Sequence, residues 1–402
     1  MKVCGIVAEY NPLHNGHHYQ LREARRLSCC DFVVVAMSGA FVQRGEPAGW
    51  DKWTRARWTL TAGADLVLEI PAAYCLQAAP GFAFGGVGTL AATGLLTHLS
   101  FGAECADLSL LSRFAALEES GAFCAALRLS LNAGKSYPAA RYDAVCALLP
   151  EQEAFLWKEP NTLLAIEYLR VLSRLAPEVQ PLPIPRQGSG YHAETLEETF
   201  SSASAIRRAL SEGNLQQALP SLPSFVSETA QFSQPAVFDR LILPLLYALR
   251  TSSPEALRKI QGVGEGIESS LYQGGAGISL ADVMEYCKSK RYTLARTQRM
   301  LSGILVGYTK ELCALANQKP PYLRVLGVRK TALPLLGELG KRSAAPLVVR
   351  KADHAKLPDD ARKLLELDFR ASDVAALAFP APQPARRDYT EPLILWKESL
   401  PE

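Results

Sequence analysis

The opening segment of the chain constrains the fold more than any other part of the sequence. Residues Val3–Ala8 form a short apolar run, Asn11-Pro12 interrupts it, and a helical pattern begins near Gly16. A short and nearly continuous apolar run is typical of a strand that helices cover on both faces. A strand, a turn and a helix at the start of the chain therefore predict the first βα unit of an α/β domain.

The same alternation of strand and helix patterns continues through the first hundred residues. Apolar runs over residues 32–37, 65–70 and 97–101 predict three further strands, and residues 52–62 predict a helix. Strands that alternate with helices in this way indicate βαβ units. We therefore expect a Rossmann-like α/β domain with a parallel sheet.

The pattern changes farther along the chain. Residues 103–176 have a mainly helical pattern, and the four prolines between residues 177 and 185 require an extended segment. Another helix is expected from Ser201 or Ser202, and after Gly213 mainly helical stretches are joined by turns that contain Pro and Gly. We predict a catalytic domain over residues 1–215, followed by a mainly helical domain over residues 216–402.

Composition excludes several classes of protein. The formal net charge of +3 is too small to indicate a nucleic-acid binder by itself. The longest apolar region, residues 82–96, falls short of the roughly 20 residues that a membrane helix needs, and no secretory signal precedes Glu9. The 9 cysteines form no CxxC pair, so we expect reduced thiols, no protein-held metal site and a cytoplasmic location.

Two histidines flank a glycine at the predicted helix start, in the sequence His14-Asn15-Gly16-His17. The first turn of a helix offers unpaired N–H groups and a positive dipole end, and both favour phosphate. His14 and His17 share one helix face because they lie three residues apart, and two imidazoles there can stabilise charge on a leaving pyrophosphate. The alternative is a pair of surface histidines in a turn, but the position directly after the first strand favours the phosphate site.

A second polar cluster is the stretch SSASAIR at residues 201–207. Taken alone it is an ordinary capped helix start, but the two motifs together resemble the HIGH-motif nucleotidyltransferase superfamily, in which a Ser/Thr-rich stretch that ends in Ile-Arg also binds phosphate. The resemblance implies a HUP-type sheet, His14, His17 and Arg207 as catalytic residues, and phosphate contacts from Ser202 and Ser204. Ala203 departs from the pattern, because many members carry a hydroxyl there.

Longer strings narrow the resemblance. The runs GIVAEYNPLHNGH at residues 5–17, MSGAFVQRGEP at 37–47, DKWTRA at 51–56, FGAE at 101–104, PN at 160–161 and KRYT at 290–293 are similar to the tRNA(Met) cytidine acetate ligase family. That family adenylates acetate with ATP, releases pyrophosphate, and transfers the acetyl group to N4 of the wobble cytidine of elongator tRNA(Met). The resemblance extends over nearly the whole chain.

The resemblance implies a set of ATP-binding residues. They are Val7, Ala8, Glu9, Tyr10, Asn11, Pro12, Leu13, His14, Asn15, Gly16, His17, His18, Tyr19, Gln20, Gly102, Asn161, Arg186 and Gln187. The residues themselves leave two roles open. Asn161 can bond a base edge or cap the following helix, and Arg186 can bind phosphate or lie on a solvated surface.

Two further groups carry candidate ligands for anions and for RNA. Gln43 and Arg44 follow the second predicted strand, at the sheet edge where α/β proteins bind ligands, and Lys52 on the next helix can point into the same cleft; we expect these three to hold acetate or phosphate. The alternative for Lys52 is a solvated helix face paired with Asp51. Residues between Glu285 and Glu311 carry basic side chains without an acid, which favours an RNA backbone contact over a merely charged helix face. The predicted tRNA-binding residues are Lys288, Lys290, Arg291, Arg296 and Arg299.

The sequence thus predicts an ATP-dependent ligase whose partners are acetate and elongator tRNA(Met). Mg²⁺ is expected with ATP, although no Asp cluster indicates a metal cage. Two rivals remain: an adenylyltransferase of coenzyme biosynthesis, and a non-catalytic RNA-binding protein that keeps a nucleotide fold. The oligomeric state stays open.

Overall fold

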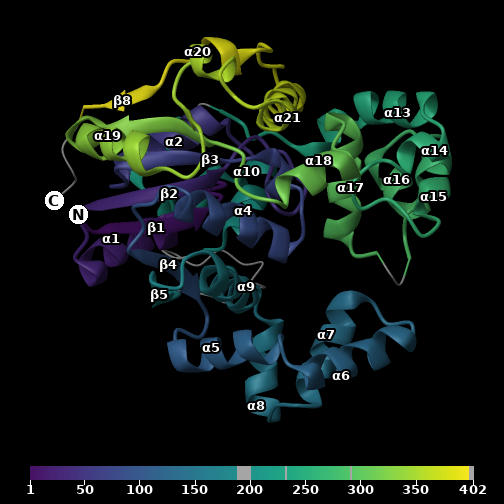
Figure 1. Cartoon of the computed structure of the whole chain (residues 1–402). Coiled ribbons are helices and arrows are strands. Elements are labelled where there is room, and N and C mark those ends of the chain that lie inside the picture. The colour runs from purple at the N-terminus through teal and green to yellow at the C-terminus, as the bar shows by residue number, and fades with distance from the viewer. Residues whose placement is uncertain (188–200, 231–232, 290–291, 398–402) are drawn as a thin grey trace.

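The structure of the chain is a computed structural model that describes residues 1–187, 201–230, 233–289 and 292–397 (Figure 1). Within these residues an eight-stranded sheet forms the centre of the molecule, in the order β5-β4-β1-β2-β3-β6-β7, with β8 paired to β6. The five N-terminal strands run parallel to one another. They are β1 (Val3–Ala8), β2 (Phe32–Ser38), β3 (Leu66–Ile70), β4 (His98–Ala103) and β5 (Gln180–Pro185).

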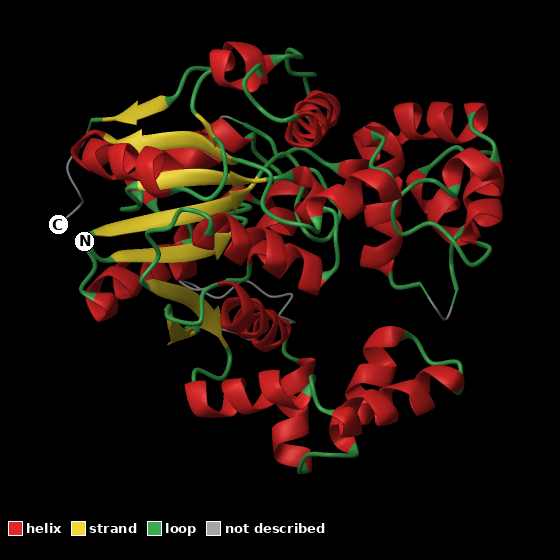
Figure 2. Cartoon of the chain, in the orientation of Figure 1, coloured by secondary structure: helices red, strands yellow, loops and turns green. Residues whose placement is uncertain are grey.

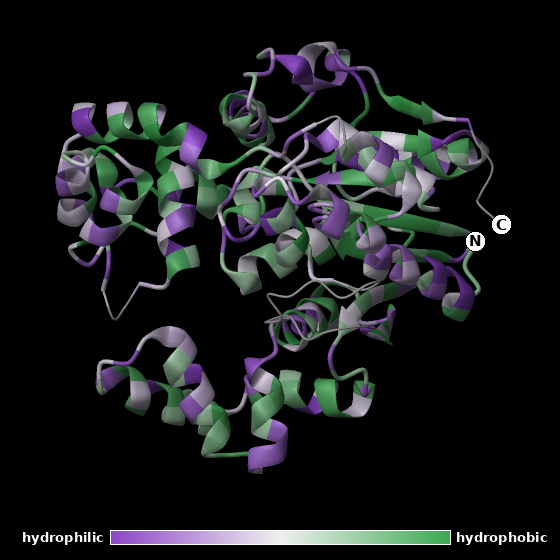
Figure 3. Ribbon diagram, turned by 180° about the vertical axis from the view of Figure 1, so that it is seen from behind, coloured by the Kyte–Doolittle hydropathy of each residue, from purple (hydrophilic) through white to green (hydrophobic). Residues whose placement is uncertain are grey.

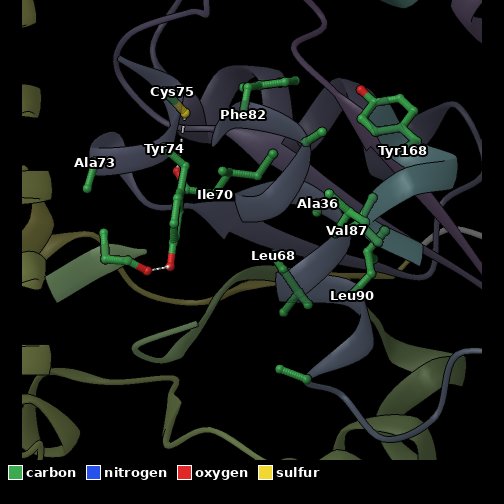
Figure 4. Packing of buried hydrophobic residues seen from close by; sticks show 14 of the residues in the cluster. Ala36, Leu68, Ile70, Ala73, Tyr74, Cys75, Phe82, Val87, Leu90 and Tyr168 are labelled. Carbon is green, nitrogen blue, oxygen red and sulfur yellow. Dashed lines mark hydrogen bonds between the residues drawn. The ribbon is translucent and has the colours of Figure 1, made fainter. Parts of the chain in front are cut away.

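Helices cover both faces of the parallel strands, as the continuous apolar runs predict. Along β2 the side chains alternate between two hydrophobic clusters: Val33 and Val35 belong to one cluster, and Val34 and Ala36 to the other. The second cluster includes Val87, Leu90 and Tyr168 from the covering helices (Figure 4). In Figure 2 the helices flank the strands on each side, and in Figure 3 the hydrophobic colouring concentrates on the strands. The covering helices are α1 (Asn15–Ser28), α2 (Lys52–Thr61), α4 (Ala79–Ala91) and α9 (Pro160–Leu175).

The strand order places a topological switch point beside β1. β1 pairs with β2 on one side and with β4 on the other, so the connections after these strands leave in opposite directions and open a crevice at their carboxyl ends. Ligands of open α/β sheets bind in such a crevice. The order therefore fixes where a site is expected before any side chain is considered.

The C-terminal part of the chain returns to this sheet with three strands, whereas the sequence predicted a mainly helical domain there. β6 (Leu323–Arg329) pairs antiparallel with β3, and β7 (Leu347–Val348) and β8 (Ile394–Trp396) pair with β6. Residues 216–402 are thus not only a helical unit beside the catalytic domain, because part of them completes its core. The fold class itself, a mostly parallel sheet with a helical remainder, is confirmed.

Two helical lobes project from the carboxyl side of the sheet (Figure 1). One lies below α9 and contains α5 (Leu108–Leu117), α6 (Gly121–Asn132), α7 (Tyr137–Cys146) and α8 (Glu151–Ala154). The other has its own hydrophobic cluster and contains α13 (Ile242–Thr251), α14 (Pro254–Leu257), α15 (Ile267–Gly274), α16 (Leu280–Tyr286) and α17 (Leu294–Val306). The remaining longer helices are α10 (Ala203–Ser211), α12 (Ser224–Ala230), α18 (Lys310–Ala316), α19 (Leu333–Arg342) and α21 (Asp359–Ala375).

A buried network of charges joins the returning strands to the first half of the chain. The Lys52 ammonium on α2 lies 2.7 Å from Glu69 of β3 and 2.6 Å from Asp388, and all three side chains are almost fully buried. Arg324 of β6 approaches the same two carboxylates. Buried charges of this kind stabilise a fold only while each has its partners, so the network ties α2, β3, β6 and the C-terminal segment to one arrangement.

The first prediction concerns this network. Lys52→Met should lower the free energy of unfolding by about 3 kcal/mol, because the two buried carboxylates then lose one of the two cations that they share, Lys52 and Arg324. Denaturant unfolding measures the effect. The matched control is Lys363→Met, since the Lys363 ammonium is exposed and lies 3.7 Å from Asp360; its effect should stay below about 0.5 kcal/mol. Equal effects of the two substitutions would contradict a structural role for Lys52.

Candidate active site

A cavity opens at the switch point, where the sequence motifs converge. Its walls come from the ends of β1 and β4, the loop after β2, and the first turns of α1, α9 and α10. The lining residues are Val7, Ala8, Glu9, Tyr10, Asn11, His14, His17, Gln20, Val42, Gln43, Arg44, Ala79, Phe82, Phe101, Gly102, Pro160, Asn161, Leu164, Tyr168, Arg186, Ser202, Ala203, Ser204 and Arg207. A smaller adjoining recess shares His14, His17, Gln20, Gly102, Arg186 and Ser202 and adds Gly16, Tyr19, Ile184, Pro185, Gln187 and Ser201.

The two histidines are held by the backbone of their own helix start. His14 is the N-cap of α1, and its Nδ1 accepts a hydrogen bond from the Gly16 N–H at 3.1 Å. His17 Nδ1 accepts from the His14 N–H at 3.4 Å, and the two rings stack with centroids 3.7 Å apart. A backbone N–H can only donate, so each neutral ring must carry its proton on Nε2. Both imidazoles are therefore hydrogen-bond donors through Nε2.

Their surroundings keep both rings neutral. Burial lowers the pKa of His14 to about 3, and Arg186 and Arg207 act in the same direction. Burial likewise lowers the pKa of His17 well below its usual value, with contributions from His14 and Arg186, while a hydrogen bond with the Pro12 carbonyl opposes the shift. The pair thus offers N–H donors rather than full positive charges.

The second prediction follows from this geometry. At pH 6 the rings of His14 and His17 should both be neutral with the proton on Nε2, because their pKa values lie below that pH. Two-dimensional NMR of imidazole ¹⁵N shifts distinguishes the two tautomers and the imidazolium form. An imidazolium signal from either residue at pH 6 would contradict the assignment; the partly exposed His98 is the internal comparison.

The helix start of α10 supplies the second motif. Ser202 is its N-cap, and its Oγ accepts a hydrogen bond from the Ala205 N–H at 3.2 Å. Arg207 lies one turn later, donates to the Asn11 carbonyl at 2.7 Å, and approaches Glu46 at 3.8 Å. The segment after β1 and the start of α10 are thereby linked across the cavity, although 196 residues separate Asn11 from Arg207 in the sequence.

Unpaired polar groups also indicate a ligand. Tyr10 and Asn11 are among the residues that line the cavity, and the Tyr10 hydroxyl and the Asn11 Nδ2 are buried without a hydrogen-bond partner among the described residues. Buried polar groups are nearly always paired, so a bound molecule is expected to supply the missing partners. Gly102 also fits this view, because a Cβ there would have no neighbour closer than 3.6 Å and would take up space in the cavity.

The structure excludes a capping role for Asn161 and places both Asn161 and Arg186 at the cavity. α9 begins at Pro160, and it is Glu104 that accepts from the Thr162 N–H at 2.8 Å, so Asn161 does not cap the helix. Asn161 instead donates to Glu104 at 2.5 Å and lines the cavity. Arg186 also lies in the wall and has Glu104 at 4.0 Å. Glu104 orients both side chains.

Several predicted ATP ligands lie outside the cavity and the recess. Leu13 is fully buried in the cluster beneath α1, and Pro12 is buried as well. The Asn15 amide donates to the Pro220 carbonyl at 2.9 Å, and the His18 ring lies against Phe225. These four residues pack around the start of α1 on the side away from the cavity, so they support this turn without lining the cavity.

The prediction that Lys52 binds acetate or phosphate is wrong. Its ammonium is engaged by Glu69 and Asp388 inside the protein, and it is not among the described residues that line the cavity. Neither acetate nor phosphate is therefore its partner, and Asp51 caps α2 through the Trp53 and Thr54 N–H groups instead. Gln43 and Arg44 do line the cavity.

The apolar wall of the cavity was not predicted. Phe82 of α4, Phe101 of β4, and Leu164 and Tyr168 of α9 face the same space; Figure 4 shows Phe82 and Tyr168 within the cluster. In the sequence these residues have the spacing of ordinary core positions. Only the packing of α4 and α9 over the end of β4 brings them to the site.

The predicted RNA-binding residues divide into groups. Lys288 is exposed and pairs with Glu285 at 3.1 Å, Arg296 lies 4.2 Å from the Tyr292 ring centroid, and Lys290 and Arg291 lie outside the described residues. The structure does not support an RNA contact for Arg299. Its guanidinium donates to the Gln43 carbonyl at 3.1 Å, and its backbone packs against the loop that carries Arg44. Burial and Arg296 lower its pKa to about 10.

Comparison with known proteins places this geometry in a family. Residues 1–390 match the family model described as HIGH Nucleotidyl Transferase. A tRNA(Met) cytidine acetate ligase from Acetivibrio thermocellus is 36% identical over 419 residues, which cover 98% of this chain and 100% of the relative. The chain belongs to the tRNA(Met) cytidine acetate ligase family. A second ligase of that name, from Caldanaerobacter subterraneus, is 35% identical over 403 residues, with 98% and 100% of the two chains covered.

A solved structure supports the same placement. The crystal structure of Thermotoga maritima TmcAL bound with alpha-thio ATP superimposes with a TM-score of 0.92 at 31% identity, and the match covers 99% of this chain and 100% of that one. The resemblance of this sequence to the ligase family is therefore confirmed over nearly its whole length.

Proposed function

We propose that this chain activates acetate with ATP, forming acetyl-AMP and pyrophosphate, and transfers the acetyl group to N4 of the wobble cytidine of elongator tRNA(Met). The observation that carries the proposal is the pair of neutral histidines, both donors through Nε2, in a cavity that also holds Arg186 and Arg207. Such donors stabilise negative charge that develops on phosphate oxygens during the displacement. The names of the relatives and the ATP analogue in the solved neighbour support the choice of substrates.

Within this proposal the residues have distinct roles. His14, His17 and Arg207 stabilise the departing pyrophosphate, with Ser202 and Ser204 at the start of α10. The nucleotide is held by Gly102, Asn161 and Arg186 with Gln187, and by the residues of the 7–20 segment that line the cavity or the recess beside Glu9 and the histidines, which are Val7, Ala8, Tyr10, Asn11, Gly16, Tyr19 and Gln20. Gln43 and Arg44 bind the acetate carboxylate or a phosphate. The reaction would take place in the cytoplasm, and no described helix is long and apolar enough to cross a membrane.

The part of the chain that the structure describes does not offer a cage for Mg²⁺. Among the described residues no group of three His, Cys, Asp or Glu side chains is placed to hold a metal ion. Mg²⁺ that accompanies ATP is usually bound by phosphate oxygens and water with one or two carboxylates, so the ion would be carried by the nucleotide. The protein contributes donors and positive charge around it.

The two alternative functions leave parts of the structure without a role. An adenylyltransferase of coenzyme biosynthesis has no use for the two helical lobes, and a non-catalytic RNA-binding protein has no use for a cavity with unpaired Tyr10 and Asn11 groups. Measuring which carboxylic acid supports exchange of labelled pyrophosphate into ATP tests the proposal. Exchange with acetate is expected; exchange without any carboxylic acid, or none at all, would contradict it.

The third prediction uses this exchange. His17→Ala should lower acetate-dependent pyrophosphate exchange by about 10²-fold or more, as expected for the loss of one preorganised donor to the transition state. ATP binding, measured by calorimetry, should weaken far less. His98→Ala, remote from the cavity at the amino end of β4, is the control. Unchanged exchange in His17→Ala would remove His17 from the mechanism.

We propose further that α17 and its neighbouring loop contact tRNA through Arg296 and Lys288, together with Lys290 and Arg291. Arg299 is left out, because its guanidinium already bonds the loop after β2. Contacts of this kind bind the phosphate backbone irrespective of sequence.

The fourth prediction distinguishes the roles of Arg296, which we propose contacts RNA, and Arg299, which supports the loop after β2. Arg296→Ala should weaken tRNA binding and reduce the slope of log K against log salt by up to about 0.9, since one phosphate contact is lost. Arg362→Ala on α21, whose side chain is partly exposed, is the matched control. Arg299→Ala should instead disturb acetate-dependent exchange, because it releases the loop that carries Arg44. Wild-type affinity and salt slope in Arg296→Ala would place the RNA surface elsewhere.

A further inference from the structure

The acyl-transfer half of the proposed reaction needs a group that accepts a proton. The N4 lone pair of cytidine is delocalised into the ring, so the nitrogen is a weak nucleophile. It becomes strongly acidic as it bonds to the acyl carbon, and a base must be within reach to take its proton. This inference rests on the proposed function and asks which residue provides that base.

The histidines are unsuited to this task. Nδ1 of each ring is occupied by a backbone N–H, at 3.1 Å for His14 and 3.4 Å for His17, so Nε2 carries a hydrogen and has no lone pair to offer. The low pKa values of both rings make them poor bases as well. The pair can donate to an anion, but it cannot accept the amine proton.

The remaining candidate is Glu9. It is the one carboxylate among the described residues that line the cavity. It follows β1 directly, and it lines the main cavity with Gln43 and Arg44 but not the recess shared by Gly102 and Arg186. Glu9 therefore shares the main cavity with Gln43 and Arg44, which we propose bind the acetate carboxylate or a phosphate.

Two hydrogen bonds fix this glutamate. Its Oε1 accepts from the Gln43 N–H at 2.6 Å, and its backbone carbonyl accepts from Arg55 Nη1 at 2.7 Å. A carboxylate can accept at both oxygens, so Oε2 remains available to a substrate. Because Oε1 is held by the loop after β2, the orientation of the carboxylate is set before any ligand binds.

We propose that Glu9 is the catalytic base of acyl transfer. As cytidine N4 attacks acetyl-AMP, the N4–C bond forms and the bond from the acyl carbon to the phosphate oxygen breaks. AMP leaves with that electron pair, and the N4 proton passes to Oε2 of Glu9. Formation of acetyl-AMP needs no such proton acceptor, because acetate attacks as an anion.

The electrostatics of the site suit this role. Burial raises the pKa of Glu9, which makes the carboxylate a stronger base, and the Gln43 N–H, Arg207, Arg55 and Arg44 limit the shift. Tyr168 and Cys75 lie near enough to Glu9 to feel its charge, and both stay protonated because burial raises the pKa of each well above its usual value. Glu9 is therefore the group whose ionisation should govern the transfer rate.

The fifth prediction tests Glu9 by separating the two half-reactions. In Glu9→Gln, single-turnover transfer of labelled acetyl from enzyme-bound acetyl-AMP to tRNA should fall by about 10²-fold or more, and far more than acetate-dependent pyrophosphate exchange falls. Hydroxylamine, whose strong nucleophilicity does not depend on an enzymic base, should still release acetyl hydroxamate from the variant. Glu178→Gln, an exposed carboxylate outside the cavity, is the matched control.

The pH profile of the wild-type enzyme is a second measurement, and it does not depend on the variant folding. The transfer rate should rise with pH as Glu9 ionises, with a midpoint above 4.5, and then level off. Transfer that is independent of pH, wild-type transfer in Glu9→Gln, or equal loss of both half-reactions would each overturn the role of Glu9. Absence of acetate-dependent exchange in the wild-type enzyme would instead overturn the proposed function itself.

Discussion

A single buried arginine, Arg55, fixes the positions of the carboxyl ends of β1 and β2, where the site lies. Arg55 of α2 is fully buried, and its guanidinium donates to the carbonyls of Glu9, Ser38 and Gly39 and, through Nε, to Trp50. Carbonyl groups just beyond the ends of strands have lost their ladder partners and must find donors elsewhere. One planar side chain with five donors meets this need for two neighbouring strands at once.

The cavity depends on that arrangement. β1 ends at Ala8 and β2 at Ser38, so the guanidinium lies beneath the segment that carries Glu9 and the loop that carries Gln43. Burial lowers the pKa of Arg55 to about 10 while Asp51 and Glu9 oppose the shift, and the side chain stays charged at neutral pH. The same helix carries Lys52, whose ion pairs reach β3 and the C-terminal segment.

An element or a site residue could be predicted from the sequence where its pattern depends on neighbouring residues alone, and not where it depends on tertiary partners. The strands at the start of the chain and the helix after His14 follow from apolar runs and a helical pattern, which are local. β6 was missed because Arg324 and Arg329 interrupt its apolar pattern; both are buried, Arg324 beside Glu69 and Asp388 and Arg329 beside Asp65. A charged residue in a strand looks solvent-exposed until its tertiary partner is known, and the misplacement of Lys52 and Arg299 has the same origin.

Within the site the sequence predicted which residues gather but not the direction in which protons move. His14 and His17 were expected to assist pyrophosphate, yet only the structure shows their Nδ1 atoms bound to backbone N–H groups. That constraint makes the histidines donors and leaves acceptance of a proton to another group. Glu9 lines the same cavity as His14 and His17, so donors and a proton acceptor border one space. In our proposal the histidines therefore stabilise the departing anion as fixed donors, and Glu9 takes the proton of the attacking amine.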